Sequence, residues 1–202
     1  MTPHTIAAVT STVCRLADID YPEVCIERPL DAVLDRARVL GVEPCDKILL
    51  YAPDAVGLHL CEAHAEIIAP VAREAPTAVA LRSVVPPVTP VCFGSMFTGY
   101  PPSAHGIAKY EKPTLTCETL FDRLTGAGKR VAIVAVRNSS IDRIFRGRRL
   151  DYFSEDYDPR VTERALRLVE AGDHDFVLVY HQEYDDTMHR TTPEAEAALG
   201  AL

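Results

Sequence analysis

This sequence lacks several features, and each absence excludes a class of protein. No apolar run in its 202 residues approaches the ~18 residues needed to cross a membrane. The N-terminus, MTPHTIAAVTSTVC, has neither the basic segment nor the apolar core of a secretory signal. None of the six cysteines forms a C-x-x-C pair, which argues against a disulfide framework or a cysteine zinc site. We therefore expect a cytoplasmic protein with reduced, mostly buried thiols and no membrane partner.

An excess of positive charge is also missing. Asp and Glu number 29 against 21 Lys and Arg, and the net charge of −8 opposes binding to nucleic acid polymers. A phosphate ligand would need local compensation for this negative field. Divalent metal ions are the natural candidates, because carboxylates that repel an anion attract it once they hold a cation. The length and the 48% hydrophobic content predict one domain, residues 1–202, with a substantial core.

Short apolar runs alternate with helical patterns from about residue 46 onward. The runs are too continuous for strands with one wet face, so they predict buried parallel strands. We expect strands at 47–52, 77–85, 130–136 and 175–180. We expect helices around 58–73, 92–97, 116–125 and 159–170. The predicted fold class is α/β: a doubly wound, mostly parallel sheet with helices on both faces.

The other segments are less regular. Residues 29–40 look helical with Gly41 as a stop, whereas residues 5–14 suit either a strand or a helix. The Pro- and Gly-rich stretch 99–113 predicts a surface loop. The basic cluster at 143–149 is either a solvated face or a contact for a substrate phosphate.

Polar residues stand directly after three of the predicted strands. Asp54 follows the first, Thr89 follows the second within PPVTP, and the acidic and imidazole-bearing segment 181–189 follows the last. Ligands of open α/β sheets bind beyond the carboxyl ends of the strands. We therefore expect a carboxylate, a hydroxyl and an imidazole to gather at one edge of the sheet.

Thr89 has two interpretations. It can be a helix N-cap, because Pro90 suits the first helical position and Gly99 suits a stop. It can also be a nucleophile, because the helix N-terminus favours an incoming anion such as a phosphoryl group. A threonine hydroxyl is a weak nucleophile at neutral pH, so the second interpretation requires a base or a metal ion.

The carboxylates and the imidazole are similarly ambiguous. Asp185 and His189, four residues apart, can form a surface pair or can be metal ligands, since Asp and His are usual ligands of zinc. Asp54 alone is equally consistent with capping the following helix.

The segment VVPPVTPVCFGSMFTGYPPSAHGI, residues 84–107, resembles the nucleophile segment of the alkaline phosphatase superfamily. The resemblance is to the type I phosphodiesterase and nucleotide pyrophosphatase branch and to the similar phosphonoacetate hydrolases. In these proteins a nucleophilic Thr or Ser stands nine residues before Thr-Gly, followed by Pro and His-Gly-Ile. Here Thr89 stands nine residues before Thr98-Gly99, and His105-Gly106-Ile107 follows. Asp54 resembles the metal-binding aspartate after the first strand, and Asp185 with His189 resembles the Asp-x-x-x-His metal motif.

The resemblance covers roughly residues 46–202 and implies an alkaline phosphatase-like fold with two divalent metal ions, zinc or alternatively manganese. Asp54 and Thr89 would bind one metal, and Asp185 and His189 the other. Thr89 would attack phosphorus to form a phosphothreonine, which water then hydrolyses. The implied substrate is a small phosphate monoester, phosphodiester, nucleotide or phosphonate; an oligomer remains open.

The family completes its metal sites with an Asp-His pair and a further His downstream of the Asp-x-x-x-His motif, and these have no counterpart before Leu202. We expect a chain that lacks the C-terminal part of the family fold. Two alternatives are a compact variant with other ligands, among Asp186, His181 and Glu183, and a catalytically impaired remnant that binds a nucleotide or metal. A phosphosugar mutase of the same superfamily is a second enzymatic hypothesis.

Overall fold

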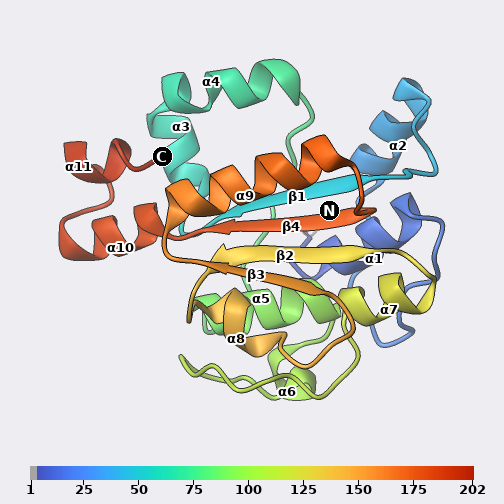
Figure 1. Ribbon diagram of the computed structural model, residues 1–202. Coiled ribbons are helices and arrows are strands. Elements are labelled where there is room, and N and C mark those ends of the chain that lie inside the picture. The colour runs from blue at the N-terminus through green and yellow to red at the C-terminus, as the bar shows by residue number, and fades with distance from the viewer. Residues whose placement is uncertain (1–3) are drawn as a thin grey trace.

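The computed structural model describes residues 4–202 and contains a four-stranded, all-parallel sheet (Figure 1). The strand order is β1-β4-β2-β3. The strands are β1 (Ile48–Pro53), β2 (Val131–Val136), β3 (Asp151–Glu155) and β4 (Phe176–His181). The helices are α1 (Ala8–Leu16), α2 (Asp31–Leu40), α3 (Leu58–Ala63), α4 (Ala65–Glu74), α5 (Thr89–Thr98), α6 (Pro102–His105), α7 (Leu120–Gly126), α8 (Ser140–Ile144), α9 (Asp158–Ala171), α10 (Glu183–Arg190) and α11 (Glu196–Leu199).

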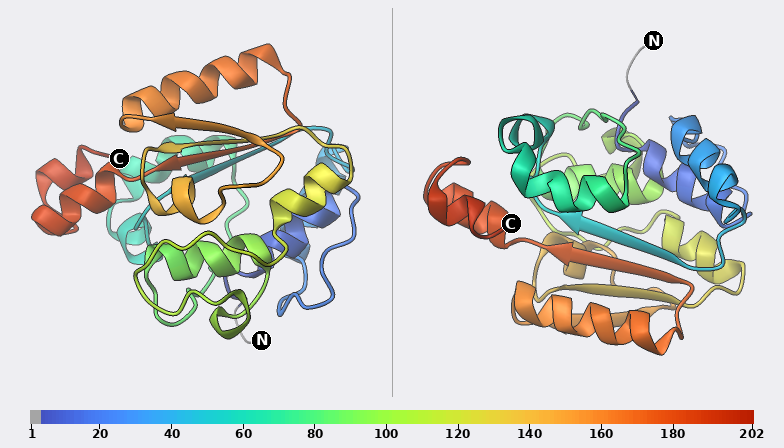
Figure 2. Two further views of the ribbon diagram at one scale, coloured as in Figure 1. Left: turned by 60° about the horizontal axis from the view of Figure 1, so that its bottom comes forward. Right: turned by 90° about the horizontal axis from the view of Figure 1, so that it is seen from above.

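Helices cover both faces of the sheet, which confirms the predicted α/β class. α9 lies on one face, and α1, α5, α7 and α8 lie on the other (Figure 2, left). β2 is buried throughout because its side chains alternate between the two layers. Ala132 and Val134 pack in the α9 layer, whereas Ile133 packs in the larger layer that contains α5.

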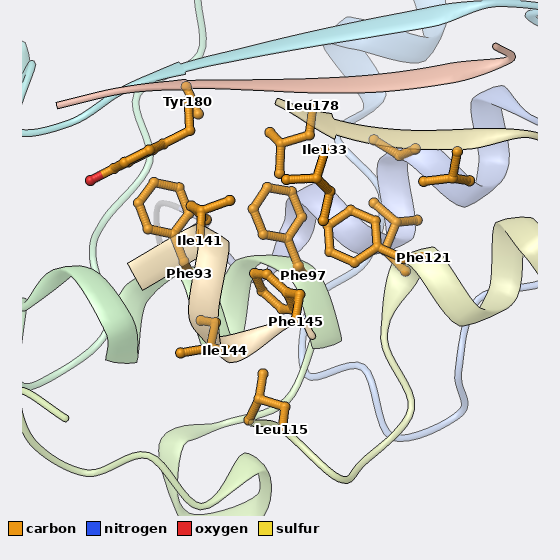
Figure 3. Packing of buried hydrophobic residues seen from close by; sticks show 14 of the residues in the cluster. Phe93, Phe97, Leu115, Phe121, Ile133, Ile141, Ile144, Phe145, Leu178 and Tyr180 are labelled. Atoms are coloured by element: carbon orange, nitrogen blue, oxygen red, sulfur yellow. The ribbon is translucent and has the colours of Figure 1, made fainter. Parts of the chain in front are cut away.

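The larger core layer is rich in aromatic rings (Figure 3). Phe97 of α5 contacts Phe121 of α7 and Phe145, with ring centroids 5.1 and 5.6 Å apart, and Phe121 and Phe145 meet edge to face at 4.9 Å. Such tilted and edge-to-face pairs add specific orientation to the burial of apolar area. They fix α5, and thus its first residue Thr89, against the sheet.

Most predicted helices are present with shifted ends. α5 begins three residues before the expected 92–97 segment, and the 58–73 segment is divided into α3 and α4 at His64. α7 begins at Leu120, where Thr119 forms a capping box with Asp122. Residues 5–14, left open between strand and helix, contain most of α1. The expected surface loop at 99–113 contains the one-turn helix α6.

Two helix ends confirm the glycine stops. α2 ends at Gly41 and α5 at Gly99, with φ of 69° and 73°. Glycine adopts this left-handed conformation without steric cost.

The predicted strand at 77–85 is wrong. Most of this segment is exposed, and its backbone bonds to the N-terminal segment instead of the sheet: Ile6 N–H donates to Arg82 O, and Arg82 N–H donates to His4 O. An apolar run alone does not specify a sheet partner. The sheet instead includes β3, a short strand with the polar sequence DYFSE that apolar content did not reveal.

β1 also departs from the expectation of a fully buried strand. It pairs only with β4, and α9 does not extend over it, so Leu49 and Tyr51 are 55% and 51% exposed. Among the described residues, no helix is long and apolar enough to cross a membrane. All six cysteines are free thiols; Cys14 is buried and the other five are half-buried, so the expected burial is only partial.

Because the two faces of the β1–β4 pair are buried to different extents, truncating a leucine on each face should lower the free energy of unfolding by different amounts. Leu178 is fully buried, so Leu178→Ala should lower the free energy of unfolding by about 2–5 kcal/mol. Leu49→Ala, on the uncovered face, should cost less than about 1 kcal/mol. Urea denaturation of both variants measures the difference, and equal losses would contradict this arrangement.

Candidate active site

Parallel pairing of β1 with β4 places the candidate residues at one end of the sheet. Pro53 lies opposite His181 in the register, and the Asp54 N–H donates to His181 O at 2.9 Å. Asp54 therefore lies beside the end of β4, although the two segments are about 130 residues apart in sequence. α10, which contains Asp185 and His189, begins two residues after β4.

The Asp54 carboxylate accepts three hydrogen bonds. Its Oδ2 accepts the Tyr180 hydroxyl at 2.6 Å and the Thr89 hydroxyl at 3.1 Å. Its Oδ1 accepts the backbone N–H of Ala55 at 2.9 Å. Ala55 has a φ of 60°, a left-handed conformation that turns the chain directly after β1. The contacts orient the carboxylate toward Thr89.

Thr89 is the first helical residue of α5, with Val88 at the N-cap position. The interpretation of Thr89 as the N-cap is therefore wrong. Its hydroxyl contacts the Asp54 carboxylate instead, and Pro90 occupies the second helical position. The difference has a physical reason: a Thr-Pro pair suits either of two adjacent registers at a helix start, and tertiary contacts select one.

Asp54, Thr89, Asp185 and Asp186 line one pocket of about 130 Å³. His189 does not line it: its side chain is 69% exposed, and its Nε2 lies 3.4 Å from Asp185 Oδ1. The structure thus gathers three of the four candidate residues and leaves the imidazole at the margin.

The pocket raises the pKa of two carboxyl groups. Burial raises the pKa of Asp54, and the hydrogen bonds from Tyr180 and Thr89 partly oppose this effect. Burial also raises the pKa of Asp185, and the nearby charge of Asp54 adds to it. Two carboxylates in one partly buried pocket repel each other, so a bound cation would stabilise both.

The donor chemistry of the pocket fits a divalent cation, because carboxylate and hydroxyl oxygens are suitable ligands. Within residues 4–202, no basic side chain forms an ion pair with Asp54. In the same range, however, no three side chains of His, Cys, Asp or Glu converge to hold one metal ion. The described residues therefore supply part of a ligand set.

The proposed substitute ligands differ in position. Asp186 lines the pocket, and its Oδ2 accepts hydrogen bonds from Tyr157 at 2.9 Å and from the Gln182 side chain at 3.1 Å. His181 bonds to Tyr51 and Thr162, and neither His181 nor Glu183 lines the pocket.

Two cationic residues of the pocket were not found by sequence reasoning. Lys112 donates to Asn138 O at 2.9 Å, and Arg137 follows β2 directly. The signal for Arg137 was available, because it stands after a buried strand as Asp54 does. Lys112 lies in the loop after α6, and in a loop the sequence pattern does not indicate where a side chain points.

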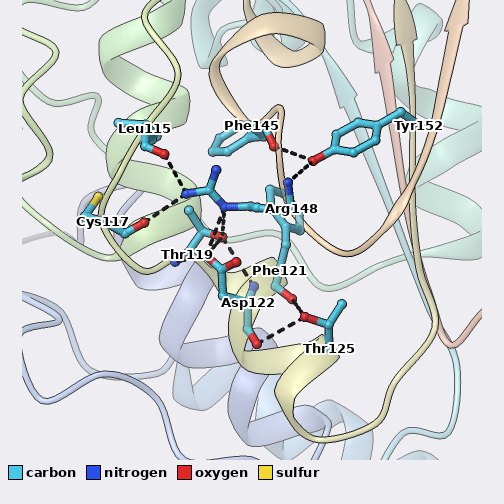
Figure 4. Close-up of polar contacts among 9 residues, drawn as sticks. All are labelled: Leu115, Cys117, Thr119, Phe121, Asp122, Thr125, Phe145, Arg148 and Tyr152. Carbon is cyan, nitrogen blue, oxygen red and sulfur yellow. Dashed lines mark hydrogen bonds and ion pairs between the residues drawn. The ribbon is translucent and has the colours of Figure 1, made fainter.

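Two residues of the basic cluster at 143–149 have structural contacts, and those of Arg148 are drawn in Figure 4. The Arg148 side chain is 8% exposed; it donates to Asp122 at 2.9 Å and to the carbonyls of Leu115 and Cys117. Arg146 bonds to Asp142 and Ser154.

The His-Gly-Ile segment also has a structural explanation. The backbone N–H of Ile107 donates to His105 Nδ1 at 3.2 Å, so Nε2 carries the hydrogen and donates to Ser95 Oγ at 3.0 Å. Gly94 permits this contact, since a Cβ there would lie 2.7 Å from His105 Cε1. The buried ring ties the loop after α5 to the helix that presents Thr89.

Comparison with known proteins supports the fold. No protein-family model matches the chain, and no curated protein matches it significantly. A crystal structure of phosphonoacetate hydrolase from Sinorhizobium meliloti 1021, in complex with phosphonoacetate, is similar with a TM-score of 0.58 and 17% identity. The match covers 77% of this chain and 50% of that one, so this chain spans about half its length. The likeness shows that the two chains share an α/β fold over the matched region.

The buried imidazole predicts a pH dependence of stability. Burial lowers the pKa of His105 below its ordinary value of 6.5, so folding favours the neutral ring. Its contribution is complete above about pH 6.5 and is lost as the pH falls through the folded-state pKa. When the pH is lowered from about 7.5 to about 5, the free energy of unfolding should therefore fall less for His105→Gln than for the unmodified protein. Urea titrations at both pH values measure this; parallel losses would exclude the effect.

Proposed function

We propose that this chain is a metal-dependent hydrolase of small phosphate esters, phosphodiesters or phosphonates, with Thr89 as the nucleophile. The observation that carries the proposal is the hydrogen bond from the Thr89 hydroxyl to Asp54 Oδ2 within a pocket at the carboxyl ends of β1 and β4. A hydroxyl beside a carboxylate at a helix start has a proton acceptor and a favourable site for an anion.

The proposed reaction begins with attack of Thr89 Oγ1 on phosphorus. Its proton passes to Asp54 Oδ2, the bond from phosphorus to the leaving group breaks, and the leaving group takes up a proton. Water then hydrolyses the phosphothreonine and releases phosphate or a phosphate monoester. Metal ions held by Asp54 with Thr89, and by Asp185 with His189, would supply charge neutralisation and a lower hydroxyl pKa.

The charges of the pocket suit a small anionic substrate. Lys112 and Arg137 line it together with the carboxylates, so positive groups offset part of the local negative charge. The volume of about 130 Å³ accommodates a phosphoryl group better than a large ligand. The similar solved structure contains phosphonoacetate, which supports including phosphonates in the substrate class.

A binding function without turnover is the second candidate. It is favoured by the incomplete ligand set, since no three metal-binding side chains converge among residues 4–202. In that case the pocket would hold a nucleotide or one metal ion. Metal binding without product formation would distinguish it from the hydrolase.

Substitution of Thr89 tests the nucleophile. With Mn²⁺ or Zn²⁺ and bis(4-nitrophenyl) phosphate, 4-nitrophenyl phosphate or phosphonoacetate as substrate, Thr89→Ala should reduce turnover at least ~10³-fold because the attacking oxygen is removed. Thr89→Ser should retain measurable activity. Release of nitrophenol or inorganic phosphate measures the rates.

Thr125→Ala is the matched control. It also removes a threonine hydroxyl. Thr125, however, lines a different pocket with Val131 and Asp151, which are the first residues of β2 and β3 and so lie at the end of the sheet away from Thr89. This variant should keep full activity, and circular dichroism should show that both alanine variants are folded. Full activity of Thr89→Ala would refute the proposed function.

A further inference from the structure

Tyr180, the fifth residue of β4, belongs to a closed set of contacts around Thr89. Its hydroxyl donates to Asp54 Oδ2, which also accepts the Thr89 hydroxyl. Its ring meets Phe93 edge to face, with centroids 5.5 Å apart. Phe93 lies one helical turn after Thr89 on α5. The contacts therefore run from Thr89 through the helix to Phe93, then to Tyr180, to Asp54 and back to Thr89.

The surroundings of Tyr180 hold its hydroxyl in one place. The residue is 2% exposed, and its ring lies at the end of the aromatic core (Figure 3). The hydroxyl points away from the packed side chains. A ring packed in this way has little rotational freedom, so the 2.6 Å contact with Asp54 defines the direction of the carboxylate.

The carboxylate depends on this contact for its orientation. Ala55 N–H holds Oδ1, whereas Oδ2 is shared by the two hydroxyls. The Thr89 contact is the longer of the two, at 3.1 Å, and in the proposed reaction its proton leaves. Tyr180 is then the remaining side-chain donor, among the described residues, that keeps Oδ2 directed toward the nucleophile.

We infer that Tyr180 is a positioning residue of the proposed reaction: it orients the Asp54 carboxylate for the Thr89 proton and for a divalent cation. This inference rests on the proposed function. Tyr180 lines the pocket, but its hydroxyl is bonded to Asp54 Oδ2, so its loss should affect turnover and cation affinity more strongly than substrate affinity. Donors behind a metal ligand commonly affect metal affinity and activity by 10–100-fold.

The test compares Tyr180→Phe with Tyr152→Phe in the full chain. Tyr152→Phe also removes a partly buried hydroxyl, which bonds to Phe145 O and the Arg148 N–H, and Tyr152 does not line the pocket. Binding of Mn²⁺ alone is measured by electron paramagnetic resonance of the free ion. Steady-state kinetics use bis(4-nitrophenyl) phosphate, and thermal denaturation establishes that each variant is folded.

For Tyr180→Phe we expect a Mn²⁺ dissociation constant raised about 10-fold or more and a kcat lowered about 10-fold. The KM should stay within about twofold. Tyr152→Phe should have the same Mn²⁺ dissociation constant, kcat and KM as the unmodified protein. If Tyr180→Phe does not fold, Phe93→Leu, which keeps the hydroxyl but loosens the ring, should lower kcat and Mn²⁺ affinity in the same direction.

The outcomes separate the two proposals. Unchanged Mn²⁺ affinity and kcat in folded Tyr180→Phe, or in Phe93→Leu where it replaces that variant, would overturn the positioning role while the hydrolase remains. Equal losses in the Tyr180 and Tyr152 variants would overturn it as well, since they would reflect stability alone. An unmodified protein that neither binds Mn²⁺ nor turns over substrate would overturn the proposed function together with this inference.

Discussion

The parallel pairing of β1 with β4 is the constraint on which the candidate active site depends. In this register Pro53 lies opposite His181. Asp54 is therefore next to Tyr180, and α10 begins close to Asp54. A shift of one residue would turn Asp54 and Tyr180 to opposite faces, since side chains alternate along a strand. Backbone hydrogen bonds at both ends of the pair, from Ile48 N–H to Asp175 O and from Asp54 N–H to His181 O, hold the observed register.

A second layer of constraint comes from the aromatic core beneath the sheet. Phe97 fixes the C-terminal end of α5, and Phe93 joins the middle of the same helix to Tyr180. The helix start is thereby held against the end of β1 at hydrogen-bond distance. Close packing transmits small displacements, so residues remote from the pocket contribute to the distance between Thr89 and Asp54.

The pocket around Asp54 differs from the rest of the protein in how its charges are compensated. Two aspartates with raised pKa values share a pocket with two cationic residues in a chain with a net charge of −8. Burying like charges is unfavourable unless hydrogen bonds or a cation compensate. Elsewhere the chain pairs such groups, as Arg148 does with Asp122. The pocket around Asp54 instead uses neutral hydroxyl donors, which leaves its negative charge available to a ligand.

The sequence by itself determined the α/β class, strands β1, β2 and β4, long helix α9 and the placement of Asp54 and Asp185 at one end of the sheet, because apolar periodicity and the carboxyl-end rule act locally or on whole elements. Thr89 reaches the same pocket from the start of α5, although the strand expected before it is absent. The sequence misplaced a strand at 77–85 and missed β3, since pairing partners are chosen by long-range contacts. Only the tertiary structure decided that Thr89 bonds to Asp54, that Tyr180 and Lys112 join the pocket, and that His189 stays exposed. Side-chain direction and burial depend on residues more than 30 positions away, which no local pattern encodes.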